Sequence, residues 1–177
     1  RQQNNNTRNT KQVLFLLFVL NFSLVLTTET LMETETGLDL NSLNKHWIRI
    51  RNRSSNKCLS RVNNAASTVA QMPCSNKDYN QFWLITKHGN DWEFKTMYND
   101  FAMDIYNYED TDGTRILVAQ RHGKNNQRWY FYRNNGDWYE IKSRDNHKCI
   151  DIPSSKSDSF LGIQIWGCNG AHAQQFT

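Results

Sequence analysis

Hydrophobic and polar residues alternate over short runs through most of the chain after residue 45. The clearest alternation lies in residues 47–51 (WIRIR), 92–95 (WEFK) and 138–142 (WYEIK). A period of two residues is typical of strands with one buried face. Clusters of turn-forming residues separate these runs, for example residues 110–113 and 134–137. Hydrophobic residues do not recur at helical spacing in this region, so the sequence predicts an all-β domain.

A continuous hydrophobic run near the N-terminus departs from this alternation. Residues 13–26 (VLFLLFVLNFSLVL) follow Arg8 and Lys11 and precede a polar segment. A basic region followed by an apolar run of this length is typical of a secretory signal peptide. A bilayer-spanning helix needs about 20 apolar residues, so no permanent membrane span is expected. We expect residues 1–28 to be a signal peptide or leader and residues 29–44 to be a flexible tether. The protein is therefore expected to be secreted and extracellular.

Removal of such a leader would change the charge of the chain. The full sequence has 21 Lys and Arg against 17 Asp and Glu, a formal net charge of +4. Loss of Arg1, Arg8 and Lys11 leaves 18 basic residues against the same 17 acids. Binding to nucleic acid usually needs a strong positive charge, so nucleic acid is not an expected partner of this nearly neutral protein.

Three short segments of the domain end alike and recur at intervals of 46 and 47 residues: 80–83 (NQFW), 126–129 (NQRW) and 173–176 (AQQF). A repeat of this length cannot bury a core alone and must pack against its copies. Three copies of a few short strands close most economically into a barrel with threefold pseudosymmetry, which leaves no long unpaired sheet edge. The expected domain covers residues 45–177, with repeats at about 45–89, 90–135 and 136–177.

The four cysteines fit this repeat. Four cysteines allow three pairings, and only one of them places both bridges at equivalent positions of two repeats: Cys58 with Cys74 and Cys149 with Cys168. The second repeat has Ala102 and Arg121 there, so both partners are absent together. Each bridge would stabilise the fold by about 3 kcal/mol. The chain has no Cys-x-x-Cys motif and no histidines at ligand spacing, so neither a metal site nor another cofactor is expected.

The third repeat carries three motifs, in residues 148–152 (KCIDI), 162–170 (GIQIWGCNG) and 173–176 (AQQF). This combination of Cys-x-Asp, Gln-x-Trp followed by Cys, and a closing Gln-x-aromatic resembles the ricin B-type lectin family. The resemblance extends over about residues 45–177. It implies a β-trefoil with three pseudosymmetric repeats, and glycans of glycoproteins or glycolipids as partners. It also implies binding of galactose or N-acetylgalactosamine in a shallow pocket of each competent repeat.

The chemistry of such a pocket allows each repeat to be judged separately. A carboxylate accepts hydrogen bonds from two vicinal hydroxyls, and an aromatic face covers the apolar patch of the sugar ring. The third repeat offers Asp151 as the acceptor and Trp166 as the aromatic platform, with Gln164 and Gln174 as amide partners. Ala173 stands where the family usually has Asn, which removes one amide. We expect the main carbohydrate-binding site in this repeat.

The second repeat is a possible second site, because it keeps an acid and the amide, Asp104 and Asn126. Alignment on the third repeat puts Ala119 where Trp166 lies, so this repeat lacks the platform. Two tyrosines shortly after the acid are candidates to replace the platform: Tyr106 and Tyr108.

The first repeat is expected to be scaffold. Ser60 replaces the acid and Met72 replaces the aromatic, so only Asn80 remains of the binding residues. With about one competent pocket per chain, avidity would require an oligomer or a partner subunit.

An enzyme and an interaction module are the alternatives to a lectin. The sequence shows no Ser or Cys nucleophile with a positioned base and no metal-binding His pair, so an enzyme is not expected. The alternative is a trefoil interaction module without a working galactose site. Such a module, for example the binding subunit of a toxin complex, would bind acidic glycans or proteins. Arg49, Arg51 and Arg53 alternate on one predicted strand and could form its basic surface, or simply a solvated strand face.

Overall fold

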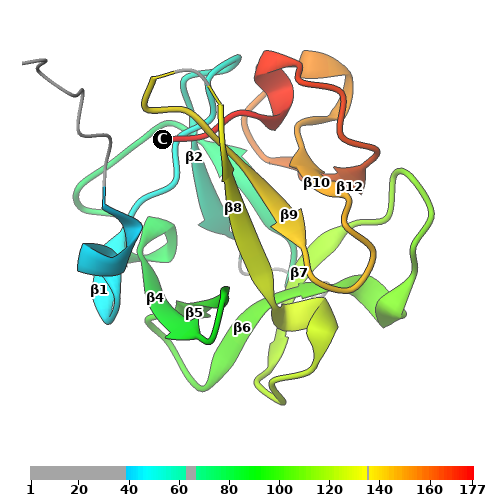
Figure 1. The fold of residues 1–177 in the computed structure, drawn as a ribbon. Helices are drawn as coiled ribbons and strands as arrows, with labels where there is room; N and C mark the ends of the chain where they lie inside the picture. The colour runs from blue at the N-terminus through cyan, green and yellow to red at the C-terminus, as the bar shows by residue number, and fades with distance from the viewer. Residues whose placement is uncertain (1–38, 63–66, 135) are drawn as a thin grey trace, which may run out of the picture. The chain divides into compact units, whose positions relative to one another are not determined.

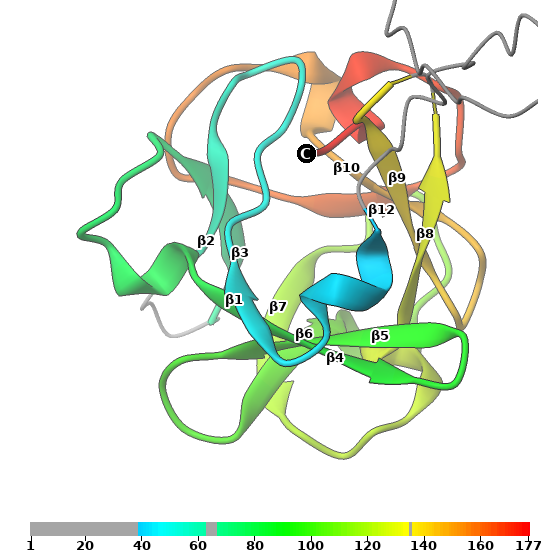
Figure 2. The same cartoon turned by 60° about the vertical axis from the view of Figure 1, so that its left-hand side comes forward.

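The computed structural model describes residues 39–62, 67–134 and 136–177. The predicted signal peptide and most of the predicted tether lie outside these residues. The end of the tether segment forms a short 3-10 helix, η1 (Leu40–Leu43), which Asp39 caps by accepting a hydrogen bond from Asn41 N. Leu40 and Leu43 pack against the hydrophobic core. Figure 2 shows this helix as a blue coil beside β1. No helix among the described residues is long and apolar enough to cross a membrane.

Short strands and single 3-10 turns make up the regular structure of the described residues, which confirms the prediction of an all-β domain. The strands are β1 (His46–Ile48), β2 (Cys58–Arg61), β3 (Val69–Met72), β4 (Trp83–His88), β5 (Asp91–Thr96), β6 (Phe101–Ile105), β7 (Ile116–Gln120), β8 (Trp129–Arg133), β9 (Tyr139–Ser143), β10 (Cys149–Asp151), β11 (Leu161–Gly162) and β12 (Gln164–Trp166). The other 3-10 turns are η2 (Tyr79–Gln81), η3 (Tyr106–Tyr108), η4 (Asn125–Gln127), η5 (Pro153–Ser155) and η6 (His172–Gln174).

The strands that begin and end each repeat close into a barrel. β1 pairs with β4, and the pairing continues through β5 and β8 to β9, always antiparallel. Phe176 then bridges both Tyr139 and Asn52, so the end of the chain joins the last strand to the first repeat. Figure 1 shows the C-terminus beside the cyan segment that leads into β2. The barrel therefore has no open edge at this seam.

Three hairpins cap the barrel, one from each repeat: β2–β3, β6–β7 and β10–β12. They contact one another through three bridges between equivalent positions: Thr68 with Leu117, Arg115 with Gln164, and Gly162 with Ala70. A six-segment barrel capped by three equivalent hairpins is a β-trefoil, as the repeat and the family resemblance predicted.

The residues that define the repeat hold the core together. The closing rings of the three repeats, Trp83, Trp129 and Phe176, are fully buried. Trp83 Nε1 also donates to Leu59 O at 3.0 Å. Each ring lies two residues after a 3-10 turn that ends on a buried glutamine, so the recurring motif is a turn that leads into a barrel segment.

Both disulfides form as the repeat predicted, between Cys58 and Cys74 and between Cys149 and Cys168. In the second repeat an ion pair occupies the corresponding place. Arg121 Nε donates to Glu93 Oε2 at 2.7 Å, and the Glu93 side chain is only 1% exposed. The local crosslink of the other repeats is thus replaced here by a buried electrostatic contact.

Candidate carbohydrate-binding site

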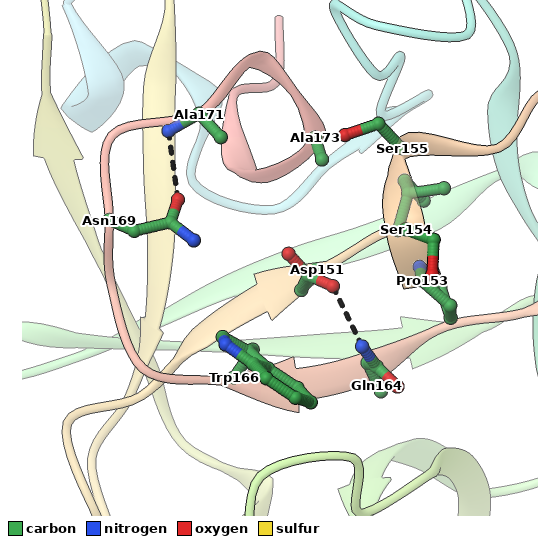
Figure 3. Close-up of a pocket in the computed structure, with 10 residues that line it drawn as sticks. Asp151, Pro153, Ser154, Ser155, Gln164, Trp166, Asn169, Ala171 and Ala173 are labelled. Carbon is green, nitrogen blue, oxygen red and sulfur yellow. Dashed lines mark hydrogen bonds between the residues drawn. The ribbon is translucent and has the colours of Figure 1, made fainter.

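A pocket of about 340 Å³ opens on the third repeat. The β10–β12 hairpin forms its floor with Asp151, Gln164 and Trp166, as Figure 3 shows. The turn η5 forms one wall, and Ser154 and Ser155 there have φ values of 54°, in the left-handed region. These two residues turn the chain sharply after β10, so the pocket has a side wall immediately beside the acid.

Asp151 lies at the bottom of this pocket and is 6% exposed. Its place follows from the hairpin register, which sets it directly opposite Gln164. Gln164 Nε2 donates to Asp151 Oδ1 at 2.8 Å, and Gln174 Nε2 donates to Asp151 Oδ2 at 3.1 Å. A carboxylate offers about four acceptor sites, so about two remain for hydroxyls of a ligand.

The environment of this acid raises its pKa above the ordinary value. Burial is the main cause, because it disfavours the charged form, and the charge of Asp112 adds to the effect. The hydrogen bonds from Gln164 and Gln174 act in the opposite direction and stabilise the carboxylate. The result is a poorly hydrated acceptor whose two oxygens are fixed in direction.

Gln174 acts from behind the acid and does not line the pocket. The side chain is fully buried, its Oε1 accepts from Asn169 N at 2.8 Å, and its Nε2 also donates to Gly167 O at 3.0 Å. The sequence placed Gln174 among the ligand-binding residues, and the geometry gives it the part of a positioning residue that orients Asp151.

The same amide recurs in the other repeats with a carboxylate partner. Gln127 Nε2 donates to Asp104 Oδ2 at 2.8 Å. In the first repeat, where Ser60 replaces the acid, Gln81 Nε2 donates to Asp78 Oδ2 at 3.2 Å. This glutamine is therefore part of the scaffold in every repeat, whether or not the repeat has a pocket acid.

Trp166, at the end of β12, is 41% exposed and lines the pocket beside Gln164 (Figure 3). The second repeat supports it from the side, since a Cβ atom added to Gly113 would lie 3.9 Å from the indole. The next residue is held as well, because Gly167 N donates to Asp112 Oδ1 at 3.0 Å. Lys148 Nζ donates to the same oxygen at 2.6 Å. The backbone directly after the indole is thus held by Asp112 of the second repeat.

Asn169 is a pocket residue that the sequence did not single out. Its Oδ1 accepts from Ala171 N at 2.9 Å, and Figure 3 shows the side-chain nitrogen directed toward the pocket. Ala173, at the position where the family usually has Asn, is also in the lining. Asn169 supplies an amide on the same side of the pocket as Ala173. The only sequence signal for Asn169 is its place directly after Cys168.

The second repeat brings its predicted residues together around Asp104. Asn126 Nδ2 donates to Asp104 Oδ1 at 3.0 Å, and His122 Nε2 lies 3.3 Å from Asp104 Oδ2. Burial raises the pKa of Asp104, and the surrounding amides and His122 oppose this shift. The predicted alignment is confirmed, since Ala119 lies opposite Ala102 in the same way that Trp166 lies opposite Cys149.

An aromatic ring is linked to this second acid through His122. Tyr106 and Tyr108 belong to η3, which follows Asp104 as η5 follows Asp151. The Tyr108 ring is 45% exposed and stacks on His122 with centroids 6.1 Å apart and planes 18° apart. The second repeat therefore has an acid and an exposed ring, in an arrangement different from that of the third repeat.

An acid, an amide and an exposed indole in one pocket of a trefoil are the groups that recognition of a sugar requires. The chain belongs to the ricin-type β-trefoil lectin domain family, whose model matches residues 46–176. A search of curated protein sequences found no match.

Solved structures share the fold at low sequence identity. The designed threefold-symmetric protein ThreeFoil has a TM-score of 0.70 and 20% identity, with 73% of this chain and 95% of that chain covered. The ricin B-like lectin of Macrolepiota procera, in complex with lactose, has a TM-score of 0.67 and 16% identity, with 76% and 94% covered. An exo-β-1,3-galactanase from Clostridium thermocellum has a TM-score of 0.68 and 23% identity, and the chain covers 29% of its length against 73% of its own. At these identities the likeness concerns the fold.

Proposed function

We propose that this protein is a secreted lectin that binds galactose or N-acetylgalactosamine type glycans, mainly through its third repeat. One observation carries the proposal. The carboxylate of Asp151 is held by two side-chain amides at the bottom of a pocket, and the exposed indole of Trp166 lines the same pocket. Family membership supports it, and so does the lactose complex of the Macrolepiota procera lectin.

The pocket binds a sugar by two complementary contacts. Two vicinal hydroxyls donate to the oxygens of Asp151, and these bonds are strong because the acceptor is charged. The apolar face of the ring lies on the indole of Trp166. The amide of Asn169 and the carbonyl oxygen of Gln164 are placed to hydrogen-bond the remaining hydroxyls. The residues do this by binding alone, and the proposed role is recognition without catalysis.

Affinity for a single sugar is expected to be weak. A shallow pocket buries little surface, and hydroxyls exchange water for protein partners with a small net gain. The second repeat, with Asp104, Asn126 and Tyr108, offers a weaker additional site. Useful avidity then comes from this second pocket, from an oligomer or from a partner subunit.

The alternative of a basic interaction surface on the first repeat has less support. Arg49 lies over the Phe82 ring at 5.8 Å, and Arg51 Nη1 donates to Asn56 Oδ1 at 3.3 Å. Arg53 Nη1 donates to Gln175 Oε1 at 2.5 Å. Each of the three arginines has a separate local partner, so they do not converge on one anion-binding point.

A glycan array tests the proposal directly. The purified protein is expected to bind glycans with terminal galactose or N-acetylgalactosamine, and free galactose should compete with this binding while free mannose should not. Binding confined to heparin-like glycans, sensitive to salt and unaffected by Asp151→Asn, would favour the interaction module instead.

A further inference from the structure

Four side chains form one row across the second and third repeats. The β10–β12 register sets Asp151 opposite Gln164, and an antiparallel bridge sets Gln164 opposite Arg115. Tyr106 N donates to Arg115 O at 3.2 Å, which continues the β6–β7 register and sets Tyr106 opposite Arg115. Residues directly opposite each other in antiparallel strands project from the same face. The row therefore leads from the pocket acid to an aromatic ring of the neighbouring repeat.

Arg115 comes close to the pocket in this row. Hydrogen bonds flank its pair with Gln164, from Ile116 N to Ile163 O and from Ile165 N to Thr114 O. This is the non-hydrogen-bonded type of pair, in which side chains lie closest. Opposite Cβ atoms are about 5 Å apart. The pair Asp151–Gln164 and the pair Gln164–Arg115 together place the Cβ of Arg115 about 10 Å from that of Asp151. Arg115 is outside the pocket lining, and its guanidinium lies over Tyr106 on the side away from Gln164. A substituent that extends from a sugar bound at Asp151 toward the second repeat thus comes within reach of this long side chain.

The second repeat has a glycine, Gly113, between Trp166 and Arg115. Gly113 N donates to Ile165 O at 2.9 Å, and the residue lies beside both Trp166 and Gln164. A Cβ atom added there would be 3.9 Å from each of these side chains. Without a side chain at this position, nothing from residue 113 separates the indole from Arg115.

The guanidinium of Arg115 stacks on a ring, and within the described residues no ion pair neutralises its charge. It lies 3.9 Å above the centre of the Tyr106 ring, and the Arg115 side chain is exposed. Among the described residues, no carboxylate forms an ion pair with it. Stacking on a ring leaves the planar donors of arginine free at their edges, where they match the oxygens of a carboxylate or sulfate.

The position of Arg115 is specific to this pocket. The equivalent bridges of the other repeats place Thr68 and Gly162 there, and neither is charged. The charge thus stands at the one hairpin contact that borders the pocket with an indole platform.

We propose that Arg115, supported by Tyr106, is an anion subsite of the third-repeat pocket. It binds a sulfate or carboxylate group carried by the bound galactose or by the sugar attached to it. This inference rests on the proposed function, and it narrows the ligand class to acidic galactose-containing glycans. The second repeat thereby contributes to the specificity of the third.

Titration calorimetry with neutral and anionic forms of one disaccharide tests the subsite. The probes are lactose, lactose sulfated on the 3 or the 6 position of galactose, and lactose sialylated on the same positions. At low ionic strength we expect at least one anionic form to bind about five- to tenfold more tightly than lactose. The sulfated and sialylated arms distinguish the two sources of the anion.

Arg115→Gln is the decisive variant, because it removes the charge and leaves the Asp151 pocket intact. It should bind lactose as the unaltered protein does and lose the preference for the anionic form. Arg133→Gln is the matched control, since Arg133 is another exposed arginine, on β8, whose Nε donates to Gly136 O at 3.0 Å. This control should keep the preference.

The outcomes separate the two proposals. Equal or weaker binding of every anionic form, or a preference that survives Arg115→Gln, would overturn the anion subsite and leave the lectin assignment in place. Lack of binding to all five saccharides would overturn the lectin assignment and the subsite with it.

Discussion

Asp151→Asn is expected to separate recognition from folding, because Asp151 lines the pocket and is held by side chains that can also bind an amide. The substitution keeps the shape of the side chain and removes its charge and one of its two acceptor oxygens. Gln174 cannot turn its amide, because its two ends are held by Asn169 N and Gly167 O. Gln164 can rotate and present its oxygen to the new amide. The variant therefore keeps a hydrogen bond to each glutamine.

The two effects of the substitution differ greatly in size. Hydrogen bonds to a charged group contribute about 1.5–3 kcal/mol each and neutral ones about 0.5–1.5 kcal/mol. Replacing two charged bonds by one neutral bond costs about 2.5–4.5 kcal/mol of binding, a loss of about 70- to 2,000-fold. Stability should change by less than about 1 kcal/mol, because the partners remain satisfied.

The sign of the stability change at neutral pH follows from the pKa of Asp151. Burial raises this pKa in the folded protein above its unfolded value. The stabilisation from such a group is complete below the unfolded pKa and is lost as the pH rises through the folded pKa. At pH 7 the ionised form thus opposes folding slightly, so removal of the charge should not lower the melting temperature.

Lactose titration followed by calorimetry, together with thermal unfolding at pH 7, measures both effects. The expected result is undetectable lactose binding and an unchanged or slightly higher melting temperature. Lactose affinity within threefold of the unaltered protein would refute the role of Asp151 as the hydroxyl acceptor. A large drop in melting temperature would show instead that the carboxylate is a structural group.

Trp166→Ala should weaken lactose binding by about tenfold or more while the circular dichroism spectrum stays the same, because the indole is 41% exposed and contributes little to the core. Unchanged affinity would remove it from the site. Lactose binding should fall as the pH decreases through the raised pKa of Asp151, so a titration at constant ionic strength should give a midpoint above the ordinary value of 3.8; a midpoint at or below that value would contradict the burial argument. Arg121→Ala should lower the free energy of unfolding in urea by about 3 kcal/mol, because it leaves the buried carboxylate of Glu93 without its closest partner. A loss below about 1 kcal/mol would mean that Arg128, at 3.6 Å, is sufficient for Glu93.

The features of the fold that could be predicted are those that depend on the spacing of particular residues along the sequence. The recurrence of the Gln-x-aromatic motif predicted the barrel. The equivalent positions of the cysteines in the first and third repeats predicted both disulfides. The alternation in residues 47–51 predicted a longer strand than β1, which ends at Ile48. At Arg51 and Asn52 the chain pairs through isolated bridges to Cys58 and Phe176, so its hydrogen bonds go to different neighbours from those of β1.

The candidate site was predictable only within one repeat. Asp151, Gln164 and Trp166 come together because a hairpin register relates them, and residue spacing encodes that register. The approach of Arg115 could not be foreseen, since contacts between hairpins depend on how three repeats pack in space. The role of Gln174 was missed for a related reason: a sequence does not show whether an amide faces a pocket or the interior.

The glutamine that lies two residues before each closing ring has a carboxylate partner from a different position in the first repeat than in the third, and this affects how such a chain can evolve. In the third repeat Gln174 binds the pocket acid, and in the first repeat Gln81 binds Asp78 instead. The first repeat thus shows that a copy can lack the pocket acid without leaving this buried amide unpaired, so one copy can lose its ligand while the barrel persists. Recognition in this architecture can be lost, regained or retuned one lobe at a time.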